Sequence, residues 1–142
     1  MRRSHSSFDW LALTVLLGTA AITLAVYPRL PEPMPSHFGI KGTADGWMPR
    51  EVAAWLLPIA TLALGLLMRF GWLLMPGEAR KLIGASPVSG IVFLFVTMLC
   101  ATQLLILHAA LNPPPRLGGA ILVLGGIALM AAGQLMPRTR RN

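Results

Sequence analysis

The sequence predicts an all-α membrane protein, a four-helix transmembrane bundle with an ordered extracytoplasmic loop between its first two helices. The chain has 142 residues, of which 55% are hydrophobic and 12% are charged, whereas soluble domains are about 25% charged. The apolar residues gather in four runs, each close to the roughly 20 residues that a helix needs to cross a bilayer. A polar segment rich in proline and glycine separates the first two runs.

These runs define helices that belong to one membrane domain, residues 1–142. We expect helices at about residues 10–27, 52–75, 88–111 and 117–136, an outer loop at 28–50 and an inner loop at 76–87. Arg69 lies near the end of the second helix, from where a long basic side chain can reach the lipid headgroups. Pro58 lies near the start of that helix and is expected to bend it. Only a short proline-rich turn joins the third and fourth helices, which should therefore form an antiparallel hairpin.

The distribution of basic residues predicts how the chain is oriented. With both termini in the cytoplasm, eight lysines and arginines face inward and four face outward, in agreement with the positive-inside rule. The loop at 28–50 is then extracytoplasmic, and the expected location is a bacterial plasma membrane. A cleaved signal peptide over residues 1–27 is the alternative, although this apolar run is longer than the apolar h-region of a typical signal peptide. Basic residues at the ends of apolar runs do not suggest a nucleic-acid partner.

The outer loop is where recognition in water is expected to concentrate. Prolines favour an extended run over the first half of the loop, at Pro28, Pro31, Pro33 and Pro35. Glycines allow tight turns in the second half, at Gly39, Gly42 and Gly46. Asp45 is expected to accept hydrogen bonds from backbone amides of a turn. Phe38 and Trp47 suit either anchors at the membrane surface or an aromatic clamp on a ligand.

His37 follows the proline run and precedes Phe38, an arrangement that would hold its imidazole in a fixed place. The simplest role is a hydrogen bond that ties the loop, to a backbone carbonyl or to Asp45. Recognition of a peptide, a pH-sensitive contact and metal binding are the alternatives. His37, His108 and Asp45 or Glu32 could form a three-ligand zinc or copper site, because the topology places His108 at the outer end of the third helix. No short ligand spacing supports that site.

Two features inside the helices indicate packing. Small residues recur every seven positions in the fourth helix and form a stripe along which helices can approach closely. The glycines of the stripe are Gly118, Gly119, Gly125, Gly126 and Gly133. The stripe suits packing within the bundle or a dimer seam. Gln103 is an amide deep in a span and is expected to bond to another helix, with a polar track toward a ligand as the alternative.

The sequence does not predict an enzyme. Its five acidic residues lie away from the centres of the apolar runs. No His-Glu-x-x-His unit, Gly-x-Ser-x-Gly elbow or phosphate-binding loop is present. We therefore expect no catalytic residue and no cofactor.

A resemblance to a known family rests on the outer loop and on the chain end. The segment Leu30-Pro-Glu-Pro-Met-Pro35-Ser-His37-Phe38, followed by Gly42 and Asp45-Gly46-Trp47, resembles the N-terminal unknown-function membrane domain of SdpI-type bacterial proteins. Those proteins act in immunity to a secreted killing peptide and in signalling. The chain end from Gly133 is similar to the start of the family's second signature, with Gln134 where asparagine is usual. The remainder of that signature does not follow.

The loop and the resemblance together predict non-catalytic recognition by a multi-pass bacterial membrane protein. His37, Phe38, Asp45 and Trp47 would contact an extracellular peptide or another membrane protein, as an immunity or signalling function implies. The lipid bilayer is the other expected partner. The alternative is an accessory or assembly subunit of a larger membrane complex, and a metal-binding protein built on His37 and His108 is a third hypothesis.

Overall fold

Three long apolar helices dominate the part of the chain that the structure describes. This computed structural model describes residues 7–39, 41–78, 81, 85–114, 117, 123, 126, 127 and 130. Helix α1 covers Ser7–Val26, α2 covers Arg50–Leu74 and α4 covers Ala85–Leu111. Each contains a stretch long and apolar enough to cross a membrane. The mostly helical structure is therefore compatible with an all-α membrane protein.

The fourth expected helix, residues 117–136, falls mostly outside the described residues. Within it the backbone at positions 123, 126, 127 and 130 is helical. Of the glycine stripe only Gly126 is described, and no described residue outside its own helix lies within 4 Å of the place that a Cβ would take there. Gly118, Gly119, Gly125 and Gly133 lie outside the described residues, so the expected packing role of the stripe stays a prediction.

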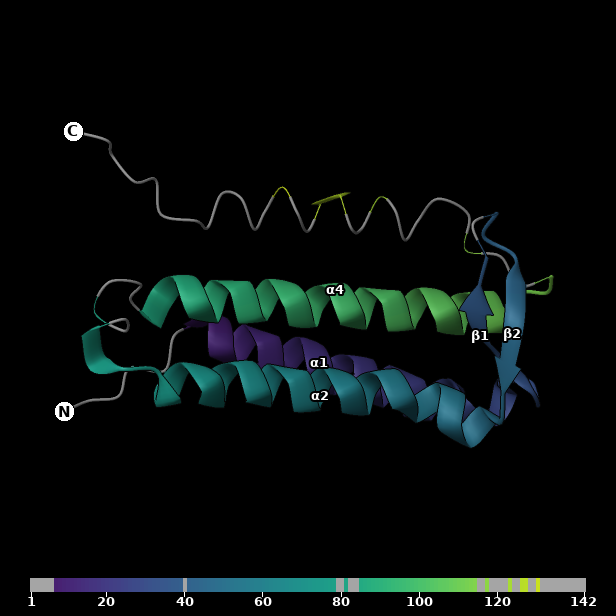
Figure 1. Ribbon diagram of the computed structural model, residues 1–142. Coiled ribbons are helices and arrows are strands. Elements are labelled where there is room, and N and C mark those ends of the chain that lie inside the picture. Colours follow the sequence, from purple (N-terminus) through teal and green to yellow (C-terminus); the bar gives the residue numbers. More distant parts are fainter. Residues whose placement is uncertain are drawn as a thin grey trace.

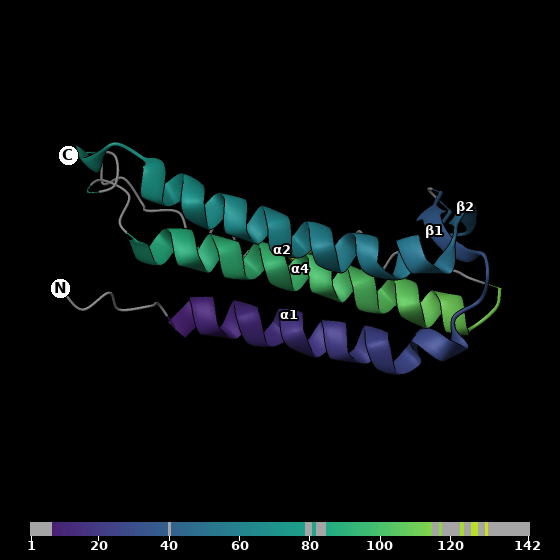
Figure 2. The ribbon, with the colours of Figure 1, turned by 90° about the horizontal axis from the view of Figure 1, so that it is seen from below.

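The three helices are arranged with α4 against both others (Figures 1 and 2). Helices α1 and α4 run in the same direction and α2 runs in the opposite one. Two buried apolar clusters hold the bundle together. One lies at the end where α2 begins and includes Ala53, Ala54 and Leu107, and the other joins Ala12 of α1 to Val92 on α4. Many leucines of α1 and α2 are exposed, as expected for surfaces that face lipid.

Pro58 shows how one helix completes the hydrogen bonds of another. Proline has no N–H, so it cannot donate to the carbonyl of Ala54, four residues earlier in α2. Nε2 of Gln103 on α4 donates to that carbonyl at 3.0 Å, from a side chain that is 1% exposed. The interhelical hydrogen bond expected of Gln103 is confirmed, and it supplies the donor that the helix lacks at Pro58.

The loop between α1 and α2 folds as a two-stranded antiparallel hairpin beside the end of the bundle where α1 ends and α2 begins (Figure 1). A 3-10 turn, Tyr27–Arg29, precedes strands β1, Met34–Phe38, and β2, Ala44–Met48. Strands were not expected in this loop, so the hairpin adds a small sheet to the mostly helical fold. An extended proline run was expected, yet Pro35 lies in β1, where a sheet edge and an irregular register accommodate it.

Candidate functional site

A glycine turn closes the hairpin. The N–H of Gly42 donates to the carbonyl of Gly39 at 2.8 Å, and the N–H of Gly39 donates to the carbonyl of Thr43 at 2.9 Å. Gly42 has a φ of 74°, a left-handed conformation that side chains other than glycine rarely adopt. The carbonyl of Gly42 accepts from the N–H of Leu117 at 2.8 Å. The turn is therefore tied to the chain that follows α4.

His37 and Asp45 face each other across the two strands. His37 Nδ1 and Asp45 Oδ1 are 2.5 Å apart, and the side chains are 75% and 51% exposed. The loop-tying hydrogen bond, one of the roles considered for His37, is thus present. Because Nδ1 is engaged by the carboxylate, contact with an outside molecule falls to Nε2. The pair forms an oriented polar group on an exposed surface.

Two glycines make room for this pair. A Cβ at Gly46 would lie 2.7 Å from Cβ of His37, and a Cβ at Gly39 would lie 2.8 Å from Oδ2 of Asp45. Both distances are shorter than carbon and oxygen atoms tolerate without displacement. The glycines of the loop therefore do more than allow a turn, since they let the backbone approach the two polar side chains.

The aromatic residues of the predicted site lie in the same small sheet. Trp47 is opposite Pro35, Gly46 is opposite His37, and Phe38 is opposite Ala44. Trp47 is 50% exposed, whereas Phe38 is half-buried. The structure thus gathers His37, Phe38, Asp45 and Trp47 on one hairpin, with an exposed indole two residues from the carboxylate. Such a surface can offer stacking or apolar contact beside a hydrogen-bonding group.

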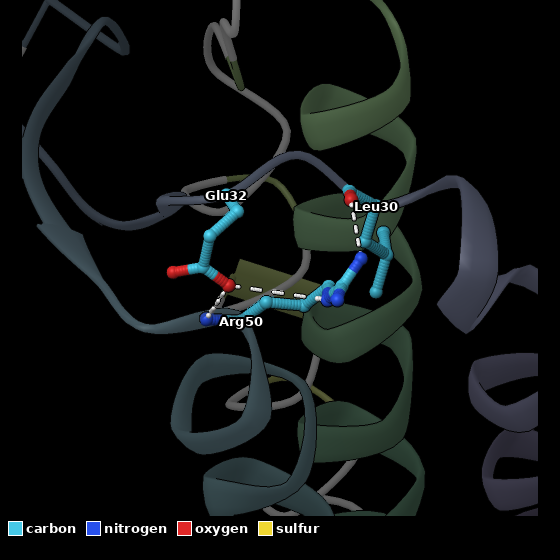
Figure 3. A network of polar contacts seen from close by, with 3 residues as sticks. All are labelled: Leu30, Glu32 and Arg50. Atoms are coloured by element: carbon cyan, nitrogen blue, oxygen red, sulfur yellow. Dashed lines mark hydrogen bonds and ion pairs between the residues drawn. The ribbon is translucent and has the colours of Figure 1, made fainter.

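A polar network connects the hairpin to the first turn of α2 (Figure 3). The N–H of Arg50 donates to Oε2 of Glu32 at 3.0 Å, so a carboxylate from the loop caps the start of the helix, where negative charge is favourable. Nη1 of Arg50 donates to the carbonyl of Leu30 at 3.4 Å, and Nε lies 3.9 Å from Oε2 of Glu32. Its guanidinium carbon lies 5.0 Å from the centre of the Tyr27 ring.

Apolar burial fixes the base of the hairpin. Met34 and Leu30 are 0% and 3% exposed and pack with Ala53 of α2 and with Leu107 and Ala110 of α4. Burying such side chains stabilises by about 1.5–3 kcal/mol each. The hairpin is consequently attached to two helices through its first strand, while the His37 and Asp45 side chains remain exposed.

The proposed three-ligand metal site does not form among the described residues. That part of the chain contains no group of three or more His, Cys, Asp or Glu side chains placed to hold a metal ion. His108 does not join His37 and Asp45. Its Nδ1 lies 3.4 Å from Nδ2 of Asn112, which also donates to the His108 carbonyl at 2.7 Å. The short spacing of His108 and Asn112 on one helix end explains this local pairing.

Sequence reasoning missed an ion pair at the other end of the bundle. Nη2 of Arg69 in α2 lies 3.2 Å from Oδ2 of Asp9 in α1, and the side chains are 30% and 20% exposed. Arg69 was expected to reach the lipid headgroups, and no partner was assigned to it. The sequence contained a signal for this pair, because Asp9 lies at the start of the first apolar run and Arg69 near the end of the second, and antiparallel helices bring these two ends together.

Comparison with known proteins connects the chain to a domain without an assigned function. Residues 14–62 match the model of a family described as domain of unknown function DUF1648. The matched segment includes most of α1, the whole hairpin and the first half of α2. No curated protein and no solved structure matches the chain.

Proposed function

We propose that the hairpin is a recognition element for an extracellular peptide or another membrane protein. In this proposal the chain is a four-helix bundle of a bacterial plasma membrane with both termini in the cytoplasm. His37, Phe38, Asp45 and Trp47 form the contact surface, and the function is non-catalytic and of the immunity or signalling type that the SdpI-type resemblance implies.

The observation that carries the proposal is an exposed polar and aromatic surface on a buried base. Met34 is fully buried, whereas the His37 side chain three residues later is 75% exposed. A histidine that served only to tie the loop would not need an exposed ring. The family match includes the hairpin together with most of α1 and the first half of α2, the two helices that the hairpin connects, which favours one functional unit.

The test is photo-crosslinking from the exposed tip in intact cells of the native host. A photoreactive amino acid replaces Lys41, which is exposed beside the Gly42 turn. We expect a crosslinked peptide or membrane protein that disappears in the Trp47→Ala and His37→Ala variants. Phe70→Ala is the matched control, because Phe70 is also an exposed aromatic residue, at 57%, but lies near the other end of α2.

The identity of the crosslinked species distinguishes an immunity function from partner recognition by a subunit. A secreted peptide as the crosslinked species supports immunity, and expression should then protect sensitive cells from that peptide. A resident membrane protein supports partner recognition by a subunit. Crosslinks to lipid alone, or crosslinks that survive both hairpin substitutions, contradict the proposal.

A further inference from the structure

A crevice lies between α1 and α2 at the end of the bundle away from the hairpin. Its volume is about 280 Å³, and its apolar lining includes Leu13, Leu16, Leu62, Leu66, Val92 and Val96. Val92 and Val96 on α4 are 6% and 5% exposed, whereas Leu13 and Leu66 are 42% and 48% exposed. The crevice therefore has a buried floor on α4 and open rims on α1 and α2.

The charged residues of the crevice lie at one end of it. Asp9 and Arg69 line the crevice with the apolar residues, and they lie beyond Leu13 and Leu66 on the two antiparallel helices. Thr61 lies eight residues before Arg69, which corresponds to about 12 Å along α2. The Thr61 hydroxyl donates to the carbonyl of Leu57 at 2.7 Å, so it presents no free donor. The crevice is consequently a narrow apolar slot with a charged mouth.

The length of α2 indicates where this mouth lies in a bilayer. Arg50 and Arg69 are 19 residues apart, or about 28 Å along a helix. The hydrocarbon core of a bilayer is about 30 Å thick. When Arg50 and the hairpin lie at one interface, Arg69 and Asp9 lie at the opposite one. The apolar slot then extends from the headgroup level into the hydrocarbon.

The charged mouth presents a cation and an anion side by side. Nη2 of Arg69 lies 3.2 Å from Oδ2 of Asp9, and this buried oxygen accepts no hydrogen bond among the described residues. A guanidinium has five N–H donors and can bind a phosphate as well as a carboxylate. The pair therefore retains capacity for one anionic and one N–H-bearing cationic group.

We propose that the crevice binds one phospholipid whose head group contains both a phosphate and a primary ammonium, as in phosphatidylethanolamine. One acyl chain occupies the slot between Leu13 and Leu66. The phosphate accepts from Arg69, and the ammonium donates to the Asp9 carboxylate, whose side chain is 20% exposed. The site is separate from the hairpin, so it stands or falls independently of the recognition function.

Lipid retention measured by native mass spectrometry tests the site. The purified full-length protein in detergent is offered phosphatidylethanolamine, phosphatidylcholine or phosphatidylglycerol with the same acyl chains. The choline head has no N–H donor and the glycerol head has no cation. Because charge-assisted hydrogen bonds are involved, we expect about tenfold stronger retention of phosphatidylethanolamine than of the other two.

Three variants connect that preference to the crevice. Gly65→Leu should reduce retention about tenfold, because a Cβ there already lies 3.4 Å from Cγ2 of Val96 and a longer side chain enters the slot. Gly18→Leu is the matched control, since no described residue outside its own helix lies within 4 Å of a Cβ at Gly18. Asp9→Asn leaves the slot open and should abolish the preference over phosphatidylcholine.

Several results overturn the proposal. They are equal retention of the three lipids, equal effects of Gly65→Leu and Gly18→Leu, and an unchanged preference in Asp9→Asn. A lipid-free protein under all conditions also overturns it, and would indicate that residues 118–136 or a second copy of the chain fills the crevice.

Discussion

The two ends of the bundle use charged residues in different ways. At the hairpin end, Glu32 and Arg50 each bond to backbone groups of another segment, namely the Arg50 N–H and the Leu30 carbonyl. At the opposite end, Asp9 and Arg69 contact each other through side chains alone. The first arrangement fixes the path of the chain. The second leaves the backbone unaffected and keeps hydrogen-bonding capacity for another molecule.

The same contrast holds for buried neutral groups. Gln103 donates to the Ala54 carbonyl at the hairpin end. Ser89, near the start of α4, is 1% exposed, and its hydroxyl has no hydrogen-bond partner among the described residues. The Gln103 amide nitrogen is therefore a structural connection between α4 and α2. The Ser89 hydroxyl contributes less to the fold, and this difference can be measured.

The largest expected effect is that of Gln103→Leu. The variant leaves the Ala54 carbonyl buried without a donor, which should lower the free energy of unfolding by about 1–3 kcal/mol. SDS titration of the purified protein in detergent micelles measures the loss. In a Pro58→Ala background, residue 58 regains an N–H that can donate to Ala54, so the same substitution should cost only about 0.5 kcal/mol. An equal cost in both backgrounds would show that Gln103 does not replace the N–H donor that Pro58 lacks.

Ser89→Ala is the matched change at the opposite end. Because the hydroxyl has no partner among the described residues, its removal should change the free energy of unfolding by no more than about 0.5 kcal/mol. A loss comparable to that of Gln103→Leu would contradict the difference between the two ends.

Gly46→Ala should have the next largest effect. Its Cβ would lie 2.7 Å from Cβ of His37, so the strands must separate at a cost of about 1–2 kcal/mol. The His37 and Asp45 side chains should move apart, which NMR chemical shifts of the imidazole can report. Gly71→Ala is the control, since a Cβ there meets nothing within 4 Å and helix propensity should stabilise the protein by up to about 1 kcal/mol.

Smaller effects than that of Gly46→Ala are expected when the two carboxylates are compared directly. Glu32→Ala removes the cap of α2 and should reduce the free energy of unfolding by about 1 kcal/mol. Asp9→Ala removes only a side-chain ion pair, and Arg69 can reach the headgroups, so we expect a loss of about 0.5 kcal/mol. Thermal unfolding in the same detergent gives both values. Equal losses would contradict the difference between the Glu32 and Arg50 pair, which bonds to the backbone, and the Asp9 and Arg69 pair, which is formed by side chains.

The sequence predicts the helices well because each depends on a local apolar run. The described helices begin at Ser7, Arg50 and Ala85, where about 10, 52 and 88 were expected. The interhelical role of Gln103 was also predictable, since an amide in an apolar run needs a partner. Its acceptor could have been inferred as well, because Pro58 leaves a carbonyl without a donor one turn earlier.

The arrangement of the candidate site was less predictable. His37 and Asp45 were predicted as residues of the site, and a hydrogen bond between them was one of several alternatives. The strands were missed because prolines disfavour them and because the register contains two irregularities. Glu32 with Arg50, and Asp9 with Arg69, are pairs that only the folded chain brings together. Their positions depend on tertiary packing, which local patterns do not determine.

Cysteine labelling in intact cells tests most directly whether α2 crosses the membrane with the hairpin on the outside. Cys100 is the one cysteine of the sequence, so Cys100→Ala gives a cysteine-free background for Lys41→Cys at the hairpin and Glu78→Cys beyond α2. A membrane-impermeant maleimide should label the hairpin variant in intact cells, and the other variant only after permeabilisation. Labelling of both positions from the same side would contradict a membrane-crossing α2, and labelling of the Glu78→Cys variant alone would place the hairpin inside the cell.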